Sequence, residues 1–163
     1  MNSSAFDLRI LMVCLGNICR SPMADGLLRR KVKDNDLNVY VDSAGTANYH
    51  IGSAPDKRMI ETAKTRGTNI EDLRGRQFSR KDFQDFDLIY VMDDSNLSNV
   101  LSMTRIEKEQ QKVRLILEEL YPTEIMHVPD PYYGSMQDFM DVYDLLDKVT
   151  DVIIEKIKNG KIG

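Results

Sequence analysis

Cys14 and Arg20 have complementary chemistry and stand six positions apart in the segment Val13–Pro22. A deprotonated Cys is a strong nucleophile. An Arg guanidinium binds phosphate oxygens through two parallel hydrogen bonds. Together they could attack a phosphate ester while holding its negative charge. The spacing alone is weak support, because a free Cys is more often a small buried packing residue.

The sequence on either side of this pair favours a phosphate site. The apolar run Leu8–Val13 predicts a strand buried on both faces. Ser21 and Pro22 predict a helix start, with Ser21 as the N-cap. The intervening loop then lies at a helix N-terminus, where free N–H groups and the helix dipole favour an anion and a thiolate. Asn17 tolerates the left-handed backbone that a ring of inward N–H groups requires, so we expect a phosphate loop after the first strand.

The chain has the composition of an ordinary globular protein, with 163 residues of which 42 % are hydrophobic and 29 % charged. This length predicts one domain over residues 1–163. The net charge of −4 argues against nucleic-acid binding. No apolar stretch is long enough to span a membrane.

The number and spacing of the cysteines and histidines indicate the redox compartment of the protein and whether it could bind a metal. Two Cys five positions apart do not form the disulfide framework of a secreted protein, so we expect a reducing cytoplasm. The two histidines, His50 and His127, form no cluster with metal-ligand spacing. We therefore expect neither a metal nor another cofactor.

Apolar periodicity predicts strands alternating with helices along the whole chain. Strands are expected over 8–13, 37–41, 88–92 and 113–117, a turn over 42–46, and helices over 21–33, 55–66, 93–103 and 139–157. This alternation predicts a three-layer α/β/α fold with a four-stranded parallel sheet. Ligands of such folds bind beyond the carboxyl ends of the strands, where the Cys14 loop would lie. Asp93 and Asp94 could cap the next helix as readily as act in catalysis.

Asp130 is the outstanding carboxylate of the chain. Departure of an alcohol from a phosphate monoester needs a proton donor, and no His lies near the motifs described here. Pro129 and Pro131 bracket Asp130, and Tyr132 and Tyr133 follow as an apolar wall that would favour the protonated acid. The alternative is a Pro- and Asp-rich surface turn. Beside the Cys14 loop, the general-acid role is the favoured hypothesis.

Four separate segments together resemble the low-molecular-weight protein tyrosine phosphatases. They are Val13–Ser21, Asp42–Gly45, Met92–Leu97 and Asp130–Gly134. The resemblance implies a metal-independent phosphatase that hydrolyses phosphotyrosine through a phosphocysteine intermediate. It further implies that Cys14 is the nucleophile, Arg20 the phosphate clamp and Asp130 the general acid.

The resemblance also implies supporting residues around the catalytic ones. Phosphate binding and loop support would come from Leu15, Gly16, Asn17, Ile18, Cys19, Ser21 and Ser43. Ser21 would steady the thiolate, and Asn17 would shape the loop with help from Ser43. The substrate pocket would be walled by Ile18, Tyr49, Tyr132 and Tyr133. Tyr49 stands where many members carry Trp, and Leu73 where some carry His.

Other functions remain as alternatives on the same fold. An arsenate reductase would need further cysteines for a disulfide relay, and this chain has only Cys14 and Cys19. Protein-arginine phosphatases resemble this chain but have Thr in place of Ile18, whose apolar bulk favours a flat aromatic substrate. A third alternative is a phosphotyrosine-binding module without catalysis.

The sequence also suggests a redox role for Cys19 and a class of protein partners. In the same tight loop, Cys19 could form a disulfide with an oxidised Cys14, or it could simply pack as an apolar residue. The expected partners are tyrosine-phosphorylated proteins, with a tyrosine kinase among them, and the expected state is a monomer or weak dimer.

Overall fold

A four-stranded, all-parallel sheet forms the centre of the structure, a computed structural model that describes residues 5–162. Its strands are β1 (Leu8–Cys14), β2 (Val39–Gly45), β3 (Leu88–Val91) and β4 (Val113–Leu115), in the order β2-β1-β3-β4. The chain thus leaves β1 for one neighbour and later crosses to the other side of β1. This switch in strand order places the loop after β1 at the expected ligand position.

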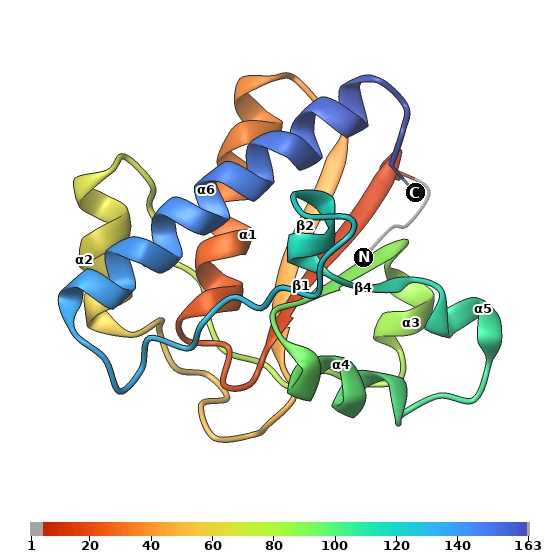
Figure 1. Cartoon of the computed structure of the whole chain (residues 1–163), viewed down its shortest axis with the longest axis horizontal. Coiled ribbons are helices and arrows are strands. Elements are labelled where there is room, and N and C mark those ends of the chain that lie inside the picture. The colour runs from red at the N-terminus through yellow and green to blue at the C-terminus, as the bar shows by residue number, and fades with distance from the viewer. Residues whose placement is uncertain (1–4, 163) are drawn as a thin grey trace.

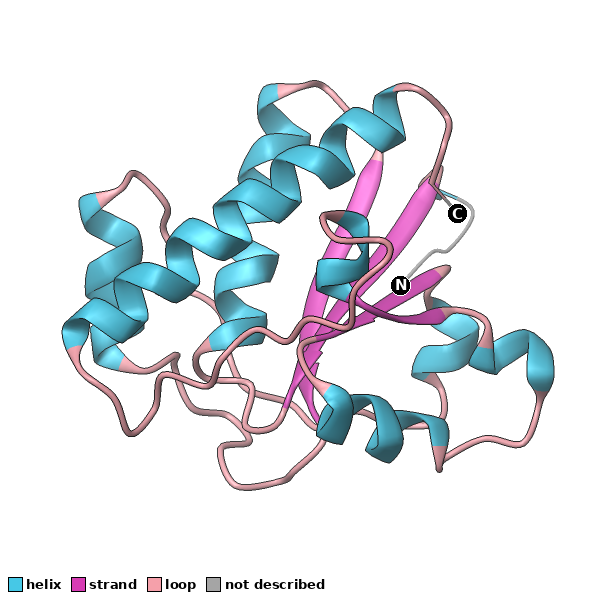
Figure 2. Ribbon diagram, viewed as in Figure 1, coloured by secondary structure: helices cyan, strands magenta, loops and turns pink. Residues whose placement is uncertain are grey.

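Helices cover both faces of the sheet (Figures 1 and 2). On one face lie α1 (Arg20–Asp34), α2 (Lys57–Thr65) and the long α6 (Met136–Lys158), and on the other α3 (Asp82–Asp85) and α4 (Asp94–Leu101). The short helices α5 (Glu107–Gln110) and η2 (Ile116–Glu119) precede and follow β4. The expected three-layer α/β/α architecture is confirmed.

Strand β1 explains why the sheet is buried on both sides. Alternate residues of this strand pack into separate apolar clusters: Ile10 and Met12 face α1 and α6, and Leu11 and Val13 face α3 and α4. All four side chains are fully buried. Burying each such side chain contributes about 1.5–3 kcal/mol, so β1 is a rigid base for the loop that follows it.

Two sequence-based predictions of element boundaries are wrong near the site. The segment predicted as a turn, 42–46, instead continues β2 through Gly45, because it pairs in register with Leu11–Cys14 of β1. Strand pairing supplies the main-chain hydrogen bonds, and it outweighs the turn-like composition. Ser21 is not the N-cap of α1, because the helix begins at Arg20 with Cys19 in the cap position.

The shortest elements differ most from the sequence-based predictions. Helices α3 and α5 span four residues each and were not predicted, since so short a segment shows no apolar period. The fourth strand is shorter than expected, with Ile116 and Leu117 in η2. None of the helices in residues 5–162 is both long and apolar enough to cross a membrane.

Candidate active site

The phosphate loop is the segment 15–19 between β1 and α1. Asn17 has a left-handed backbone with φ of 58°, as the sequence predicted. Its N–H donates to the Cys14 Sγ at 3.3 Å. The backbone N–H groups of Leu15, Gly16, Ile18, Cys19 and Arg20 donate to no acceptor on residues 5–162. At the N-terminus of α1, these groups are available to bind an anion.

The thiol of Cys14 lies at the base of this loop and is only 3 % exposed. Its Sγ is 3.0 Å from the hydroxyl of Ser21. Ser21 Oγ also accepts a hydrogen bond from Asn17 Nδ2 at 2.8 Å, so its single proton faces two acceptors, Cys14 Sγ at 3.0 Å and the Ala44 carbonyl oxygen at 3.4 Å, of which sulfur is the nearer. Because Ser21 lies inside the first turn rather than at the cap, its hydroxyl can stabilise a thiolate.

The side chain of Asn17 joins the loop to the rest of the fold. Nδ2 donates to Ser43 Oγ at 3.0 Å, and Oδ1 accepts from the Arg76 backbone N–H at 3.0 Å. At the end of β2, a Cβ added to Gly45 would lie 2.8 Å from the carbonyl oxygen of Leu15, so only glycine fits beneath the loop. The loop is therefore held from below by β2 and the segment around Arg76.

Leu73 packs partly buried against the apolar core. It leaves the Asn17 side-chain oxygen to the backbone N–H of Arg76. The loop support in this chain thus uses a main-chain donor at that point.

Arg20 is buried at 3 % exposure and is held by a carboxylate that the sequence did not assign to it. Its Nη1 donates to Asp93 Oδ2 at 2.7 Å and to the Val128 carbonyl at 3.1 Å. Burial by itself would lower the pKa of Arg20, but Cys14, Asp93 and Asp130 together raise it. The guanidinium therefore remains charged beside the nucleophile.

Asp93 has two functions in the structure. It caps α4 as predicted, accepting from the Asn96 N–H at 2.8 Å. Burial opposes its ionisation, but hydrogen bonds from Arg20 and Asn96 hold its pKa below the ordinary value. The sequence signal that could have placed Asp93 beside Arg20 is its position at the carboxyl end of a predicted strand. That strand, β3, pairs directly with β1, so the carboxyl ends of the two strands lie side by side.

Asp130 lies in the same site although 110 positions separate it from Arg20. Its Oδ2 is 3.6 Å from Arg20 Nη2, and its side chain is 43 % exposed. Its Oδ1 accepts from the Tyr132 N–H at 3.1 Å. The carboxyl group is therefore within reach of both a bound phosphate ester and solvent.

A cleft of about 220 Å³ opens above Cys14. The phosphate loop, the loop after β2 and the loop before α6 line it with Cys14, Leu15, Gly16, Ile18, Cys19, Arg20, Tyr49, His50, Asp130, Tyr132 and Tyr133. Every predicted pocket residue is thus present, and His50 is an addition that the sequence did not identify as a pocket residue. Its ring packs against Gly16, where an added Cβ would lie 3.2 Å from His50 Cδ2.

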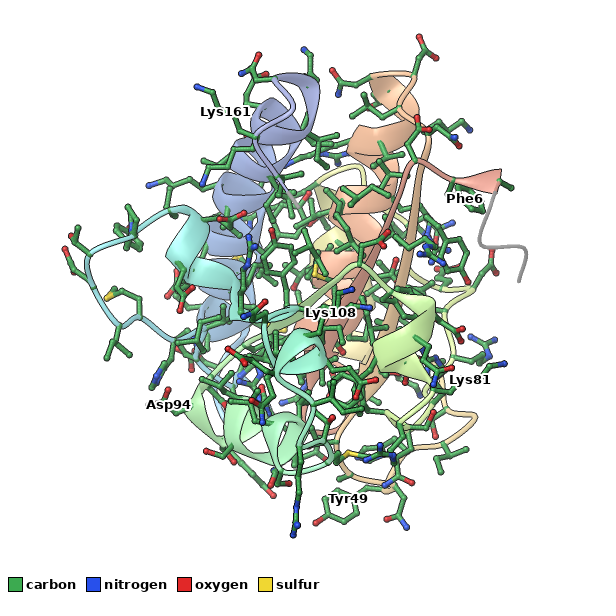
Figure 3. All side chains as sticks on the ribbon, turned by 90° about the vertical axis from the view of Figure 1, so that its right-hand side faces the viewer. Phe6, Tyr49, Lys81, Asp94, Lys108 and Lys161 are labelled. Carbon is green, nitrogen blue, oxygen red and sulfur yellow. The ribbon has the colours of Figure 1, made fainter. Side chains whose placement is uncertain are left out.

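The pocket walls differ in how firmly they are held. Ile18 is buried, whereas Tyr49 and Tyr133 are 72 % and 95 % exposed and form the rim. Figure 3 shows Tyr49 at the edge of the molecule, on the loop after β2. Tyr132 is partly buried and meets Tyr133 edge-on, with ring centroids 4.9 Å apart. The expected slot therefore has a fixed base and an open aromatic rim.

Cys19 is a free thiol with 4 % exposure beside the nucleophile. Burial raises its pKa strongly, and the charges of Asp56 and Cys14 raise it further. Cys19 is therefore a neutral thiol at physiological pH. Within residues 5–162, no group of three or more His, Cys, Asp and Glu side chains is placed to hold a metal ion.

Comparisons with known proteins agree with this geometry. The family model described as low molecular weight phosphotyrosine protein phosphatase matches residues 9–161. The enzyme of that name from Schizosaccharomyces pombe is 40 % identical over 140 residues, 84 % of this chain and 88 % of that protein. The one from Rattus norvegicus is 36 % identical over 149 residues, 90 % of this chain and 94 % of that protein.

Solved structures give the same result. The crystal structure of a protein tyrosine phosphatase from Entamoeba histolytica, with Hepes in its active site, aligns with a TM-score of 0.88 at 35 % identity. That alignment covers 96 % of this chain and 100 % of the other. The chain therefore belongs to the low molecular weight phosphotyrosine protein phosphatase family.

Proposed function

We propose that this phosphatase hydrolyses phosphotyrosine through a covalent phosphocysteine at Cys14. The observation that carries the proposal is the position of the Cys14 sulfur. It lies 3.0 Å from the Ser21 hydroxyl and 3.3 Å from the Asn17 N–H, at the base of a cleft that Arg20 and Asp130 also line.

In the first step the thiolate of Cys14 attacks phosphorus, and an S–P bond forms while the bond from phosphorus to the tyrosine oxygen breaks. The loop N–H groups and Arg20 hold the three equatorial oxygens, where charge accumulates in the transition state. Asp130 transfers its proton to the departing phenolate. The products of this step are the dephosphorylated tyrosine and the phosphocysteine.

In the second step Asp130, now ionised, takes a proton from a water molecule that attacks phosphorus. An O–P bond forms and the S–P bond breaks, which releases inorganic phosphate and regenerates the Cys14 thiolate. Asp130 ends the cycle protonated. The Asp130 side chain is 43 % exposed, which supports the access of the attacking water molecule to its carboxylate.

Tyrosine-phosphorylated proteins are the proposed substrate class, with a tyrosine kinase among them. The aromatic rim of Tyr49, Tyr132 and Tyr133 supports recognition of an aromatic ring above the phosphate loop. Ile18, buried and apolar, gives no polar partner to a phosphoguanidinium group, so we prefer tyrosine to arginine as the substrate. With only Cys14 and Cys19 in the sequence, arsenate reduction through a longer disulfide relay is disfavoured.

We further propose a single catalytic domain over residues 1–163 that works in the cytoplasm as a monomer or weak dimer, without nucleic-acid partners. Two free cysteines, both buried, suit a reducing compartment. The net charge of −4 suits partners other than nucleic acid.

Phosphopeptide turnover tests the proposed function directly. The purified protein should release phosphate from phosphotyrosine peptides much faster than from matched phosphoarginine or phosphoserine peptides. After rapid quenching with acid, mass spectrometry should find phosphate on Cys14. Preference for phosphoarginine, or no phosphate on Cys14, would contradict the proposal.

A further inference from the structure

Arg58, in the first turn of α2, does not line the cleft and has no part in the chemistry described above. Its guanidinium donates to the main chain of the loop that carries Asp130, because Nη2 lies 3.0 Å from the carbonyl oxygen of Tyr132. Among the described residues, this is the one hydrogen bond that another element makes to the main chain of residues 129–134. Arg58 therefore fixes a loop that has few other hydrogen bonds.

The residue that Arg58 holds also orients the catalytic acid. The Tyr132 N–H donates to Asp130 Oδ1 at 3.1 Å. The other carboxyl oxygen, Oδ2, is 3.6 Å from Arg20 Nη2, which is too far for a hydrogen bond. Because the Asp130 side chain is exposed, packing alone does not fix its position. The position of the Asp130 carboxyl group therefore depends on the main chain at Tyr132.

Arg58 is itself held in one orientation by Asp56, the N-cap of α2. Asp56 Oδ1 accepts from the Arg58 backbone N–H at 2.8 Å and from Nε at 3.0 Å, and Oδ2 accepts from Nη2 at 2.8 Å. Burial by itself would raise the pKa of Asp56, but the hydrogen bonds from Arg58 lower it, so the two side chains are paired as ions. The guanidinium carbon also lies 4.5 Å from the centroid of the Phe139 ring in α6.

The start of α2 is also bonded to the phosphate loop. The backbone N–H of Asp56 donates to the carbonyl oxygen of Ile18 at 2.8 Å. A continuous series of contacts thus joins the phosphate loop to the acid, and its members in order are Ile18, Asp56, Arg58, Tyr132 and Asp130. This series sets the position of the acid relative to the loop where phosphate is expected to bind.

We propose that Arg58 is a positioning residue, which holds the carboxyl group of Asp130 within reach of the leaving oxygen of a phosphate ester bound above Cys14. General-acid catalysis requires the donor at hydrogen-bond distance, and a misplacement of about 1 Å costs up to about 10²-fold in rate. The inference rests on the proposed function, because it assigns Arg58 a part in the proton transfer by Asp130. It assigns Arg58 no part in binding phosphate.

The experiment measures kcat/KM for a series of aryl phosphates in Arg58→Met, a substitution that removes the charge and keeps an apolar stem. Esters of basic phenols should lose about tenfold, whereas esters of very acidic phenols should be nearly unaffected because they need little protonation. Inhibition by inorganic phosphate should equal that of the wild type, since Arg20 and the loop N–H groups are intact. Asp56→Asn, which keeps a good N-cap, should show the same dependence on the leaving group with a smaller loss.

Arg66→Met is the matched control, because Arg66 follows the other end of α2 and makes a similar set of contacts with α6. Its Nη1 donates to the Met140 carbonyl at 3.2 Å and to the Asp144 carboxylate at 2.8 Å, and its guanidinium carbon lies 5.1 Å from the centroid of the Tyr143 ring. None of these contacts reaches the loop of Asp130. Arg66→Met should therefore keep the wild-type kcat/KM across the series, and a loss confined to basic leaving groups would overturn the role of Arg58.

The double variant Arg58→Met/Asp130→Asn decides whether Arg58 acts through the acid. In the Asp130→Asn background, Arg58→Met should cause no further loss for basic leaving groups, because both changes affect one proton transfer. Losses that multiply in the double variant, or an equal loss across the leaving-group series in Arg58→Met, would overturn the role of Arg58 alone. Failure of the proposed acid has a different signature: Asp130→Asn by itself would show no dependence on the leaving group, which would overturn both assignments.

Discussion

Arg20 and Asp93 are 73 positions apart in sequence, yet Arg20 Nη1 lies 2.7 Å from Asp93 Oδ2. The first residue belongs to the loop–helix junction after β1, and the second caps the helix after β3. Parallel pairing of β1 with β3 brings these two strand ends together. The Asp93 carboxylate therefore holds the buried Arg20 guanidinium in position beside the loop where phosphate is expected to bind.

Asp93→Asn should weaken this support. Replacing a charged hydrogen-bond acceptor should lower stability by about 1–3 kcal/mol and kcat/KM by about tenfold. Urea unfolding and steady-state kinetics with an aryl phosphate measure the two effects. Asp94→Asn is the matched control, since Asp94 is exposed and pairs only with His127 among the described salt bridges. Equal behaviour of the two variants would contradict a special role for Asp93.

The same pair predicts a dependence of stability on pH. The pKa of Asp93 is lowered in the fold, because Arg20 and the Asn96 N–H outweigh burial. Its contribution is therefore present above the ordinary pKa of 3.8 and is lost as the pH falls through the lowered value. In acid, the stability difference between wild type and Asp93→Asn should shrink. A constant difference down to pH ~2 would argue against the pairing.

Cys14→Ser should reduce turnover by at least about a thousandfold, because a hydroxyl is far less acidic than a thiol. Binding of an oxyanion such as phosphate should persist, since Arg20 and the loop N–H groups remain. Arg20→Lys should also be severe, because a point charge cannot form two parallel hydrogen bonds. Steady-state kinetics measure turnover by the two variants, and calorimetric titration with phosphate measures their oxyanion binding. Near-normal turnover in either variant would refute the mechanism.

Asp130→Asn tests general-acid catalysis. Loss of the proton donor should reduce kcat by about 10²–10⁴ for aryl phosphates with basic leaving groups. Esters of very acidic phenols need little protonation and should be nearly unaffected. A leaving-group series for wild type and variant separates these cases. An equal loss across the series would leave Asp130 with a structural role alone.

Ile18→Thr tests substrate choice. Ile18 is a buried wall of the cleft, and a hydroxyl there would offer a hydrogen bond to a phosphoguanidinium group. The ratio of phosphotyrosine to phosphoarginine turnover should fall by about tenfold. The wild type should also discriminate against phosphoserine, whose phosphate is too close to the backbone to reach Cys14. Faster hydrolysis of phosphoserine than phosphotyrosine peptides would contradict the proposed slot.

Cys19→Ser tests whether Cys19 protects the nucleophile. Peroxide should convert Cys14 to a sulfenic acid, and attack by Cys19 would form a disulfide with loss of water. The raised pKa of Cys19 should make this attack slow, because burial keeps it a thiol. Cys19→Ser should keep basal activity but recover poorly when thiol is added after peroxide. Equal recovery, with no Cys14–Cys19 disulfide by mass spectrometry, would leave Cys19 as packing.

The phosphate loop could be predicted from the sequence, because the residues that indicate it follow one another along the chain. An apolar strand, the loop with Asn17 and the start of α1 follow one another directly, so Cys14 and Arg20 could be placed in a phosphate loop without long-range contacts. Apolar periodicity likewise sufficed for the order of the main strands and helices. The family and its phosphatase activity, first suggested by resemblance, are confirmed by comparison. The roles of individual residues stay predictions until the variants are measured.

Only the tertiary structure decided which partner each polar side chain takes. Ser21 looked like a cap, but packing of α1 on β2 directs its hydroxyl to Cys14 instead. Asp93 both caps α4 and accepts a hydrogen bond from Arg20, and only the pairing of β1 with β3 brings these two residues together. Short polar side chains can bond to several local groups, and the choice depends on strand register and helix packing, which no local pattern encodes.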